Sequence, residues 1–291
     1  MGRSSYSQYS MWTSCPQKYK LSYIDKKRKP AGIHAQFGTA MHSTMQHYLS
    51  VYYNVTKKAA DEINIEKLLQ QNLMEAVAKD SEKLPDGEFV CTRAEIEEFY
   101  WQGVEILRYF VRDANIRKLF QKKGYELVGI EVPVNIKIRE GVSVIGFIDV
   151  ILKDDLGNYI IIDLKTSTSG WSNWQKNDEV KKNQIILYKM WYSEQYNVPI
   201  DKIRVAFHIM KRIIPAETEA NPWPNPRIST FVPPSGKIKQ RQAIDDFMYF
   251  INEVFDANGK HIDKDYVKKP GKHCSWCDHH ISNGGECDGI S

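Results

Sequence analysis

The stretch GFIDVILKDDLGNYIIIDLKT, residues 146–166, decides the fold of this chain. Its two flanks are rich in Ile and Val, as β-strands are. Its middle, residues 154–158, holds the Asp, Gly and Asn residues that tight turns favour. The stretch therefore predicts a β-hairpin that folds about Leu156.

This hairpin brings three charged side chains together. Folding about Leu156 places Asp149 opposite Asp163, with Cβ atoms roughly 5 Å apart across the antiparallel pair. Because strand side chains alternate, Asp163 and Lys165 share a face, whereas Leu164 points into the core. Two carboxylates and an ammonium group thus converge at one end of an otherwise apolar hairpin.

Carboxylates this close repel each other, and burying them is costly. A divalent cation removes that penalty, and Mg²⁺ and Mn²⁺ prefer hard oxygen ligands. Such an ion polarises a phosphoryl oxygen and lowers the pKa of a bound water, while Lys165 positions that water or offsets charge in the transition state. The chemistry fits phosphodiester hydrolysis, with Asp149 and Asp163 as metal ligands. The alternative is a surface hairpin whose Asp and Lys residues form exposed ion pairs.

The order and spacing of these residues match a known pattern, which runs Asp149, thirteen intervening residues, then Asp163-Leu164-Lys165 and Thr166. It resembles the core of PD-(D/E)xK nucleases. It is similar to their RecB-like branch, which includes the nuclease domains of RecB and AddB, lambda-type exonucleases and CRISPR-adaptation exonucleases. Gly146 stands where the superfamily's nominal proline would be. The resemblance implies a restriction-endonuclease-like α/β fold, with a mixed β-sheet core flanked by helices, and metal-dependent cleavage of DNA.

Two helical motifs of these families occur in the expected order. Residues 38–42, Gly-Thr-Ala-Met-His, resemble the G-x-x-x-H motif, which implies that His42 is a metal ligand. Residues 184–188, Gln-Ile-Ile-Leu-Tyr, resemble the Q-x-x-x-Y motif. The spacing of Gln184 and Tyr188 places both on one helix face, and the resemblance implies that they order the site or the substrate.

Two further ligands complete the set that the resemblance implies. Glu131, on the strand before the hairpin, matches an acidic position near the metal, and the backbone carbonyl of Leu164 is an additional ligand. The alternatives remain open: a lone helix histidine is usually structural, His47 lies beside His42, and Glu131 is explained equally well as part of a solvated face.

The rest of the chain shows helical and strand periods in turn. Apolar residues recur at helical spacing before Tyr125, and strand alternation begins there. The order indicates a mixed α/β sheet with a helical flank. The predicted helices are 4–24 (broken near Cys15-Pro16), 36–54, 62–80, 92–119, 178–196 and 237–256, and the predicted strands are 125–138, 142–153, 158–165 and 202–212.

No internal repeat, low-complexity tract or clean two-domain boundary divides the sequence, so we expect a single nuclease domain over residues 1–291. A Pro-rich stretch that carries Trp223 is too long for a simple turn and is expected to form a strand or a flap over the substrate, or else an insertion without function. The expected parts are a helical part at 1–124, a catalytic core at 125–212, the flap at 213–235, and a C-terminal helix with cysteines at 236–291.

Four of the five cysteines lie near the two ends of the sequence, at positions 15, 274, 277 and 287. In a reducing compartment disulfides are disfavoured, so a metal or a cluster explains this set better. The fifth, Cys91, is expected to be a buried helix residue.

The first of these cysteines carries a second resemblance. Cys15-Pro16 resembles the first cluster cysteine of AddB and the CRISPR-adaptation exonucleases. This implies a [4Fe–4S] cluster whose ligands are Cys15, Cys274, Cys277 and Cys287. The alternative is tetrahedral Zn²⁺, held by four cysteines or by three with one of the histidines His273, His279 and His280.

The overall charge permits a nucleic-acid partner without requiring one, since the net charge is +4 and the pI is about 8.6. The candidate contacts lie after the second hairpin strand, where aromatic residues stand among lysines. Base stacking tolerates any sequence, so such residues suit single-stranded DNA. They are Trp171, Trp174, Lys181 and Lys182, and core packing of the tryptophans is the alternative.

No apolar stretch approaches the ~20 residues that span a bilayer, and the N-terminus lacks the apolar block of a signal peptide. We therefore expect a cytoplasmic protein. Because it has no G-x-x-x-x-G-K-[ST] motif of a helicase, it must act on single strands or DNA ends that other proteins supply. The sequence thus predicts an exonuclease of recombination, repair or phage DNA processing, with recombination or replication proteins as partners. The rival hypotheses are a non-catalytic DNA-binding protein on a nuclease-like fold and a zinc-containing nucleic-acid-binding protein.

Overall fold

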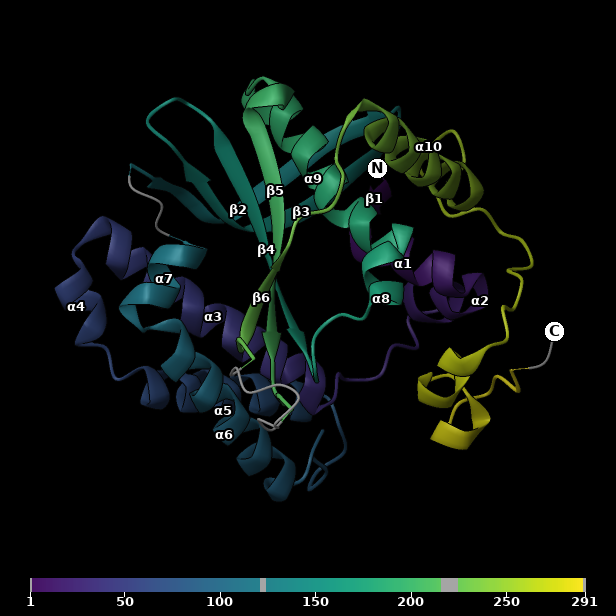
Figure 1. Ribbon diagram of the computed structural model, residues 1–291. Coiled ribbons are helices and arrows are strands. Elements are labelled where there is room, and N and C mark those ends of the chain that lie inside the picture. The colour runs from purple at the N-terminus through teal and green to yellow at the C-terminus, as the bar shows by residue number, and fades with distance from the viewer. Residues whose placement is uncertain (1, 121–123, 216–224, 290–291) are drawn as a thin grey trace.

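The computed structural model describes residues 2–120, 124–215 and 225–289. Within these residues, six strands form one mixed β-sheet (Figure 1). Along the sheet the order is β1-β3-β4-β5-β6, and β2 also pairs with β3. The mixed α/β fold is therefore confirmed. The strands are β1 (Gly2–Ser4), β2 (Glu126–Arg139), β3 (Val142–Lys153), β4 (Tyr159–Ser167), β5 (Ile203–Lys211) and β6 (Ile228–Phe231).

One face of the sheet is covered by helices that precede β2 in the chain. The longest of them, α3, lies on the strands, and α5 and α6 pack against it; their apolar faces form one core with strand residues such as Val150 and Leu164. We call this the helical core. α6 begins with a capping box formed by Thr92 and Glu95. The helices are α3 (Ile33–Asn54), α4 (Lys57–Asp61), α5 (Ile65–Ser81), α6 (Arg93–Phe110) and α7 (Asp113–Leu119).

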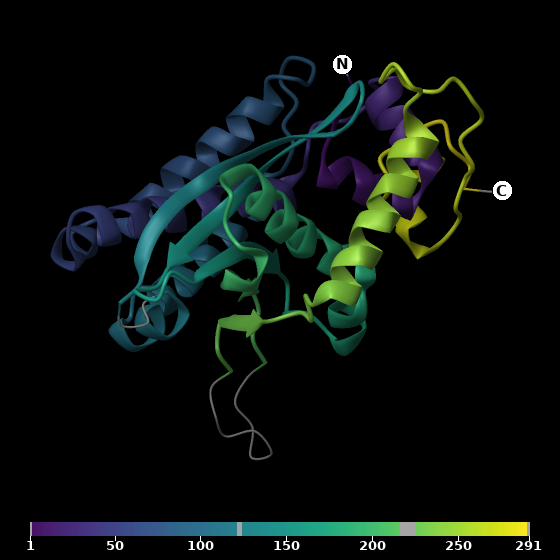
Figure 2. The ribbon, with the colours of Figure 1, turned by 90° about the horizontal axis from the view of Figure 1, so that it is seen from above.

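The other face is covered by helices from both ends of the chain and by two helices between β4 and β5. Tyr9 of α1 packs between helices, with its ring centroid 5.6 Å from that of Phe247 and 5.8 Å from that of Phe250. We call this the aromatic core. Figure 2 shows the sheet lying between these helices and those of the helical core, which are coloured blue. The elements are α1 (Tyr6–Ser14), α2 (Pro16–Tyr19), a π-helical turn (Lys20–Ile24), α8 (Asn173–Asn177), α9 (Glu179–Tyr196), a 3₁₀ turn (Ile200–Lys202) and α10 (Lys237–Val254).

Residues 256–289, which we call the C-terminal lobe, follow α10 and lie beside α2 (Figure 1). The lobe contains two 3₁₀ turns, Lys272–Trp276 and Ile281–Asn283. Polar contacts tie it to the segment after α2: Ser22 Oγ lies 2.8 Å from His279 Nε2, and Lys27 Nζ lies 2.7 Å from a carboxylate oxygen of Glu286. It therefore depends on polar contacts more than the sheet does.

β3 changes partner along one edge. β2 pairs antiparallel with β3 over nearly the whole length of both strands. On the other edge, β1 pairs parallel with residues 142–144, and β4 pairs antiparallel with residues 150–153. On this edge, residues 145–149 of β3 pair with neither β1 nor β4. The two partner strands diverge there, and we call this point the fork of the sheet.

The hairpin has the predicted register. Val150 lies opposite Ile162, and the ladder ends there, one position before the two aspartates. In the turn, the Asp154 side chain accepts hydrogen bonds from the backbone N–H groups of Leu156 and Asn158, at 3.0 and 2.7 Å. Gly157 adopts a left-handed φ of +75°, which glycine allows at little cost. The turn residues thus act as their types predict.

β2 and β3 exchange faces at the fork. A regular strand keeps residues i and i+2 on one face. Here, two cross-strand residue pairs that lie two positions apart along the strands pack on opposite faces of the sheet. The direction in which the side chains point must therefore reverse between the two pairs. On β2 the reversal falls at Glu131, whose φ of +49° is left-handed, and on β3 it falls at Asp149. The two pairs are Ile130–Val150, which packs against the helical core, and Val132–Ile148, which packs against the aromatic core.

Most predicted elements are present, and the differences have physical reasons. β1 was not predicted because three residues carry no periodic signal of their own. α8 lies between β4 and α9, where no helix was predicted, and β6 occupies residues 228–231 of the expected flap and pairs with β5. Residues 216–224 of that flap, including Trp223, lie outside the described residues. None of the described helices is both long enough and apolar enough to span a membrane.

Candidate active site

The hairpin gathers the three charged groups that the sequence singled out. Asp149 Oδ2 accepts a hydrogen bond from the backbone N–H of Leu164 at 2.7 Å. Lys165 Nζ lies 2.7 Å from Asp163 Oδ2, and Asp163 is only 2% exposed. The Leu164 side chain points away from them into the helical core. Asp163 and Lys165 therefore share a face of β4 and form an ion pair there.

One stretch of α3 faces the same carboxylates. His42 Nδ1 lies 3.6 Å from Asp149 Oδ2. One helical turn later, Gln46 Nε2 donates to Glu131 Oε1 at 2.6 Å and to the backbone carbonyl of Asp149 at 3.3 Å. Gln46 is buried. It therefore links the helix to both strands at the point where they exchange faces.

A candidate metal centre lies at this junction. The ligand atoms of His42, Glu131 and Asp149 all lie within 4.8 Å of one another. Glu131 contributes to this group from a left-handed backbone conformation, which is costly for a residue with a side chain and is found at functional sites. Two carboxylates and an imidazole make a donor set suited to a divalent cation. Asp163 is not a member of this group, because its carboxylate faces Lys165.

Burial controls the charges of these residues. Desolvation raises the pKa of Asp149 and of Asp163 to about 6, although Lys165 lowers the pKa of both. Desolvation and the positive charge of Lys165 lower the pKa of His42. A neutral imidazole can offer a ring nitrogen to a metal, and a cation offsets the cost of ionising buried carboxylates. The electrostatics therefore favour a divalent ion at this centre.

Two glycines let helices approach the hairpin closely. A Cβ at Gly38 of α3 would lie 3.4 Å from Thr166 Oγ1 on β4. A Cβ at Gly146 of β3 would lie 3.2 Å from Cε1 of Tyr188 on α9. A larger residue at Gly146 would therefore press against the Tyr188 ring, which explains the glycine at this position.

The two predicted residues of α9 lie beside the carboxylates. Tyr188 is 8% exposed. Burial and then the negative charge of Asp163 raise the pKa of Tyr188, while a hydrogen bond with Gln184 lowers it. The Tyr188 hydroxyl is therefore protonated and can donate a hydrogen bond in the site.

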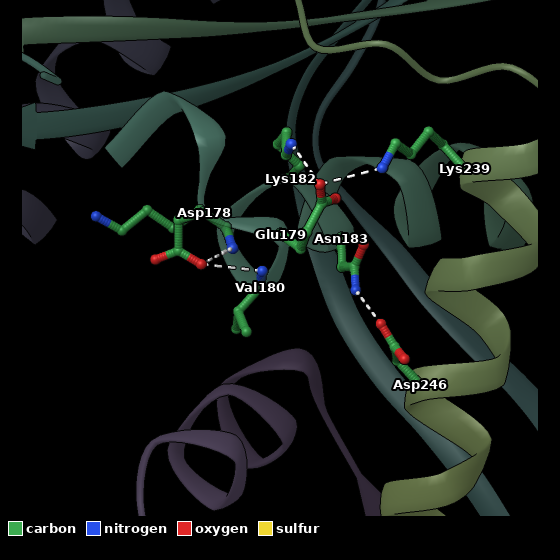
Figure 3. A network of polar contacts seen from close by, with 8 residues as sticks. Asp178, Glu179, Val180, Lys182, Asn183, Lys239 and Asp246 are labelled. Carbon is green, nitrogen blue, oxygen red and sulfur yellow. Dashed lines mark hydrogen bonds and ion pairs between the residues drawn. The ribbon is translucent and has the colours of Figure 1, made fainter. Parts of the chain in front are cut away.

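Polar contacts anchor the first turn of α9 (Figure 3). Asp178 Oδ1 accepts hydrogen bonds from the backbone N–H groups of Val180 and Lys181, at 3.0 and 3.4 Å. Glu179 Oε1 pairs with Lys182 Nζ at 2.8 Å and with Lys239 Nζ of α10 at 3.0 Å. These contacts fix the helix that carries Gln184 and Tyr188.

The four predicted DNA contacts differ in their accessibility. Trp174 of α8 is 77% exposed. Trp171 is half-buried, with its ring centroid 4.9 Å from that of Phe207, and Lys181 Nζ lies 5.4 Å from the Trp171 ring centroid. Lys182 is buried and paired with Glu179. Trp174 and Lys181 are thus the members of the set that a nucleic acid can reach most easily.

The four terminal cysteines meet in space. Cys15, Cys274, Cys277 and Cys287 line one small cavity, together with His273, His279 and His280. Cys15 comes from the junction of α1 and α2, and the other three come from the C-terminal lobe. Cys91 lies elsewhere; it is half-buried in the loop before α6, so the expectation of a buried helix residue was wrong.

Two residues of the site were not predicted. Gln46 belongs to the site because it contacts Glu131 of β2 and Asp149 of β3, and no local sequence pattern indicates these contacts. Tyr6 of α1 donates a hydrogen bond to the Val180 carbonyl at 2.6 Å, and its pKa is raised by burial and by the charge of Asp163. Only the packing of α1 against α9 brings it there.

Three comparisons with known proteins gave matches. The sequence profile of the PD-(D/E)XK nuclease superfamily matches residues 3–282. The gene 69 protein of Mycobacterium phage L5 is 28% identical over 207 residues, which are 59% of this chain and 67% of that protein. The crystal structure of SSO0001 aligns over 85% of this chain and 76% of its own, with a TM-score of 0.34 and 14% identity.

Proposed function

The chain belongs to the PD-(D/E)XK nuclease superfamily, and from this membership we propose that it is a Mg²⁺- or Mn²⁺-dependent deoxyribonuclease of the RecB-like branch that acts as an exonuclease. The observation that carries the proposal is the convergence of His42, Glu131 and Asp149 next to the Asp163–Lys165 pair. Three potential ligands and a lysine, from one helix and three strands, meet at one fork of the sheet.

The roles of the side chains follow from their surroundings. His42, Glu131 and Asp149 would hold the ion, with Asp163 and the Leu164 carbonyl completing its ligands. A bound ion supplies Lewis-acid polarisation of the scissile phosphate and a more acidic water. Lys165, whose side chain is 30% exposed, can orient the water and offset developing negative charge.

The substrate side of the site is assigned to α8 and α9. The Tyr188 hydroxyl and the Gln184 amide can donate hydrogen bonds to phosphate oxygens and so orient the strand that is cleaved. Lys181 offers charge to the backbone, and the exposed ring of Trp174 offers a surface on which a base can stack. We therefore propose that single-stranded DNA, or the end of a duplex, enters across α8.

We also propose that Cys15, Cys274, Cys277 and Cys287 hold a [4Fe–4S] cluster. The gathering of four cysteines from both ends of the chain at one cavity supports a shared metal centre, and the resemblance of Cys15-Pro16 favours iron–sulfur over zinc.

We propose that residues 1–291 work as one nuclease domain in recombination, repair or phage DNA processing. β1, from the first residues, pairs with the same strand that carries Asp149, and Cys15 joins the C-terminal lobe. These contacts link the two ends of the chain to the catalytic core. The similarity to a protein of a mycobacteriophage supports a role in phage DNA processing, in which recombination or replication proteins supply the DNA ends.

A nuclease assay with end-labelled linear DNA and a closed single-stranded circle tests the enzymatic proposal. We expect Mg²⁺ or Mn²⁺ to support progressive release of label from the linear DNA, EDTA to abolish it, and the circle to resist. Cleavage of the circle would contradict the exonuclease assignment. Binding of DNA without cleavage under any metal would contradict the nuclease assignment and favour a non-catalytic DNA-binding protein.

Metal analysis of protein purified without oxygen tests the cluster proposal separately. We expect about four iron and four sulfide per chain with the broad visible absorbance of an iron–sulfur cluster. Stoichiometric zinc in colourless protein would contradict it. The Cys91→Ser variant is the matched control and should retain its iron.

A further inference from the structure

A large groove opens on the outer side of α5 and α6, away from the catalytic fork. It encloses about 860 Å³, a size typical of binding sites. Its walls come from both helices and from the loop that joins them. The apolar lining residues are Leu73, Met74, Phe89, Ile96, Tyr100 and Trp101.

Large apolar side chains stand open to solvent at this groove. Phe89 is 72% exposed, Trp101 is 52% exposed and Met74 is 49% exposed. Contiguous apolar surface of this kind marks an interaction site, because leaving it in water is unfavourable. None of these residues takes part in the candidate active site, whose helical residues include His42 and Gln46 of α3 and Gln184 and Tyr188 of α9.

Acidic residues outnumber basic ones in the segment that forms one side of the groove. Residues 82–101 contain six acidic and two basic residues, although the whole chain has a net charge of +4. Asp86, Glu88 and Glu97 are exposed, and within the described residues none of them forms an ion pair. The carboxylate of Glu95 is engaged by Thr92 in the capping box. Glu95, Glu97 and one cation, Arg93, line the groove, and Glu88 precedes the lining residue Phe89. The groove thus combines an apolar floor with a rim that holds more acidic than basic groups.

This combination limits what can occupy the groove. The phosphates of DNA would be repelled by the acidic rim. A second copy of the chain, if it bound through the same face, would bring the same carboxylates of both copies together. A basic segment with an apolar face would instead bury its apolar side chains against Trp101 and pair its cations with Glu88 and Glu97.

We propose that this groove binds a basic amphipathic helix of a partner protein. Helices dock in apolar grooves through side chains spaced i, i+3, i+4 and i+7, and the opposite face is free to carry charge. The neighbouring helices α5 and α6 (Figure 1) provide the walls that such a helix requires. The proposal does not depend on the nuclease activity, because the groove and the fork share no residue.

Fluorescence anisotropy of a labelled synthetic peptide tests the proposal. The probe is an 18-residue helix-forming peptide with leucines at i, i+3, i+4 and i+7 and lysines elsewhere, and its matched control carries glutamates in place of the lysines. We expect saturable binding of the lysine peptide alone. Trp101→Ala should weaken it by about tenfold or more, since buried tryptophans dominate such interfaces.

Charge reversal provides the second arm. Glu88→Lys with Glu97→Lys should weaken the lysine peptide and let the glutamate peptide bind, whereas Glu194→Lys on α9 should change neither. Cleavage of end-labelled DNA by both groove variants should equal that of the wild type. Equal binding of the two peptides, or binding that Trp101→Ala leaves unchanged, would overturn the proposal. So would a dimer that Trp101→Ala dissociates, or loss of DNA binding in that variant.

Discussion

The hairpin and the C-terminal lobe are both proposed to bind metal, but the chain builds them differently. The hairpin site is embedded in the sheet: Val150, Ile162 and Leu164 beside it are fully buried. In the lobe, among its described apolar residues, only Tyr266 and Cys277 are buried. The hairpin therefore holds its carboxylates in place without an ion, whereas the lobe has a small core, and we propose that it depends for its order on the metal group that its cysteines bind.

The largest expected effect comes from a substitution in the hairpin, which should reduce activity without unfolding the protein. Lys165→Ala should reduce the rate of DNA cleavage by a factor of about 10²–10³, the usual cost of removing one group that stabilises the transition state. It should lower the melting temperature by only a few degrees, because the Lys165 side chain is 30% exposed, although its charge offsets part of the cost of burying Asp163. Single-turnover cleavage and calorimetry measure the two effects. Lys137→Ala, an exposed lysine of β2, is the control, and a variant that loses activity only by unfolding would contradict the assignment.

The opposite change tests the lobe. Cys277→Ser should release the bound metal, and trypsin should then cut the lobe among residues 264–272 much faster than in the wild type, because metal binding and folding of small metal sites are coupled. The remainder of the chain should stay folded and resist the protease. Mass spectrometry of the fragments locates the cuts. Equal resistance of the Cys277→Ser variant, with Cys91→Ser as the control, would show that the lobe orders itself.

Gln46 sharpens the comparison because it is part of what preorganises the hairpin site. Gln46→Ala should weaken Mn²⁺ binding by about 10–100-fold, the usual effect of losing a residue that orients a metal ligand. The maximal cleavage rate at saturating Mn²⁺ should change far less. Titration of activity against Mn²⁺ separates the two quantities, with Gln71→Ala on α5 as the control. An unchanged metal requirement would mean that Glu131 is held by its backbone alone.

The smallest expected effect concerns the stability of the metal-free protein. Burial raises the pKa of Asp163 from 3.8 to about 6. The folded state therefore holds that proton more tightly than the unfolded state does, so ionisation costs stability as pH rises from about 4 to 6 and the full cost persists above 6. In EDTA at pH 8, Asp163→Asn should raise the free energy of unfolding by about 1–3 kcal/mol, and the gain should vanish near pH 4. Calorimetry with Asp245→Asn as the control measures it; a loss of stability at pH 8 would contradict the electrostatic account.

Local patterns predicted the hairpin because its signals are local. The turn residues at 154–158 and the alternation on either side determine the register without reference to the rest of the chain. The same reasoning placed Asp163 and Lys165 on one face and Leu164 in the core. The meeting of the four cysteines was anticipated from a resemblance, since nothing local relates Cys15 to the C-terminal lobe.

The remaining features depend on tertiary contacts. Glu131 adopts a left-handed conformation that its residue type disfavours, so only the packing of β2 on two different cores reveals the exchange of faces. Gln46 contacts residues 85 and 103 positions away. Lys182 reads as a surface lysine in the sequence, yet the approach of α10 and the first turn of α9 bury it against Glu179. Pattern analysis has no access to such distances.

Calorimetric titration with Mn²⁺ tests the central claim most directly. The account predicts that the metal-free wild-type protein takes up Mn²⁺ at the fork of the sheet, and that Asp149→Asn and His42→Ala each abolish this uptake while circular dichroism shows both variants folded. Uptake of Mn²⁺ that neither substitution changes would contradict the assignment of His42, Glu131 and Asp149 as the metal centre.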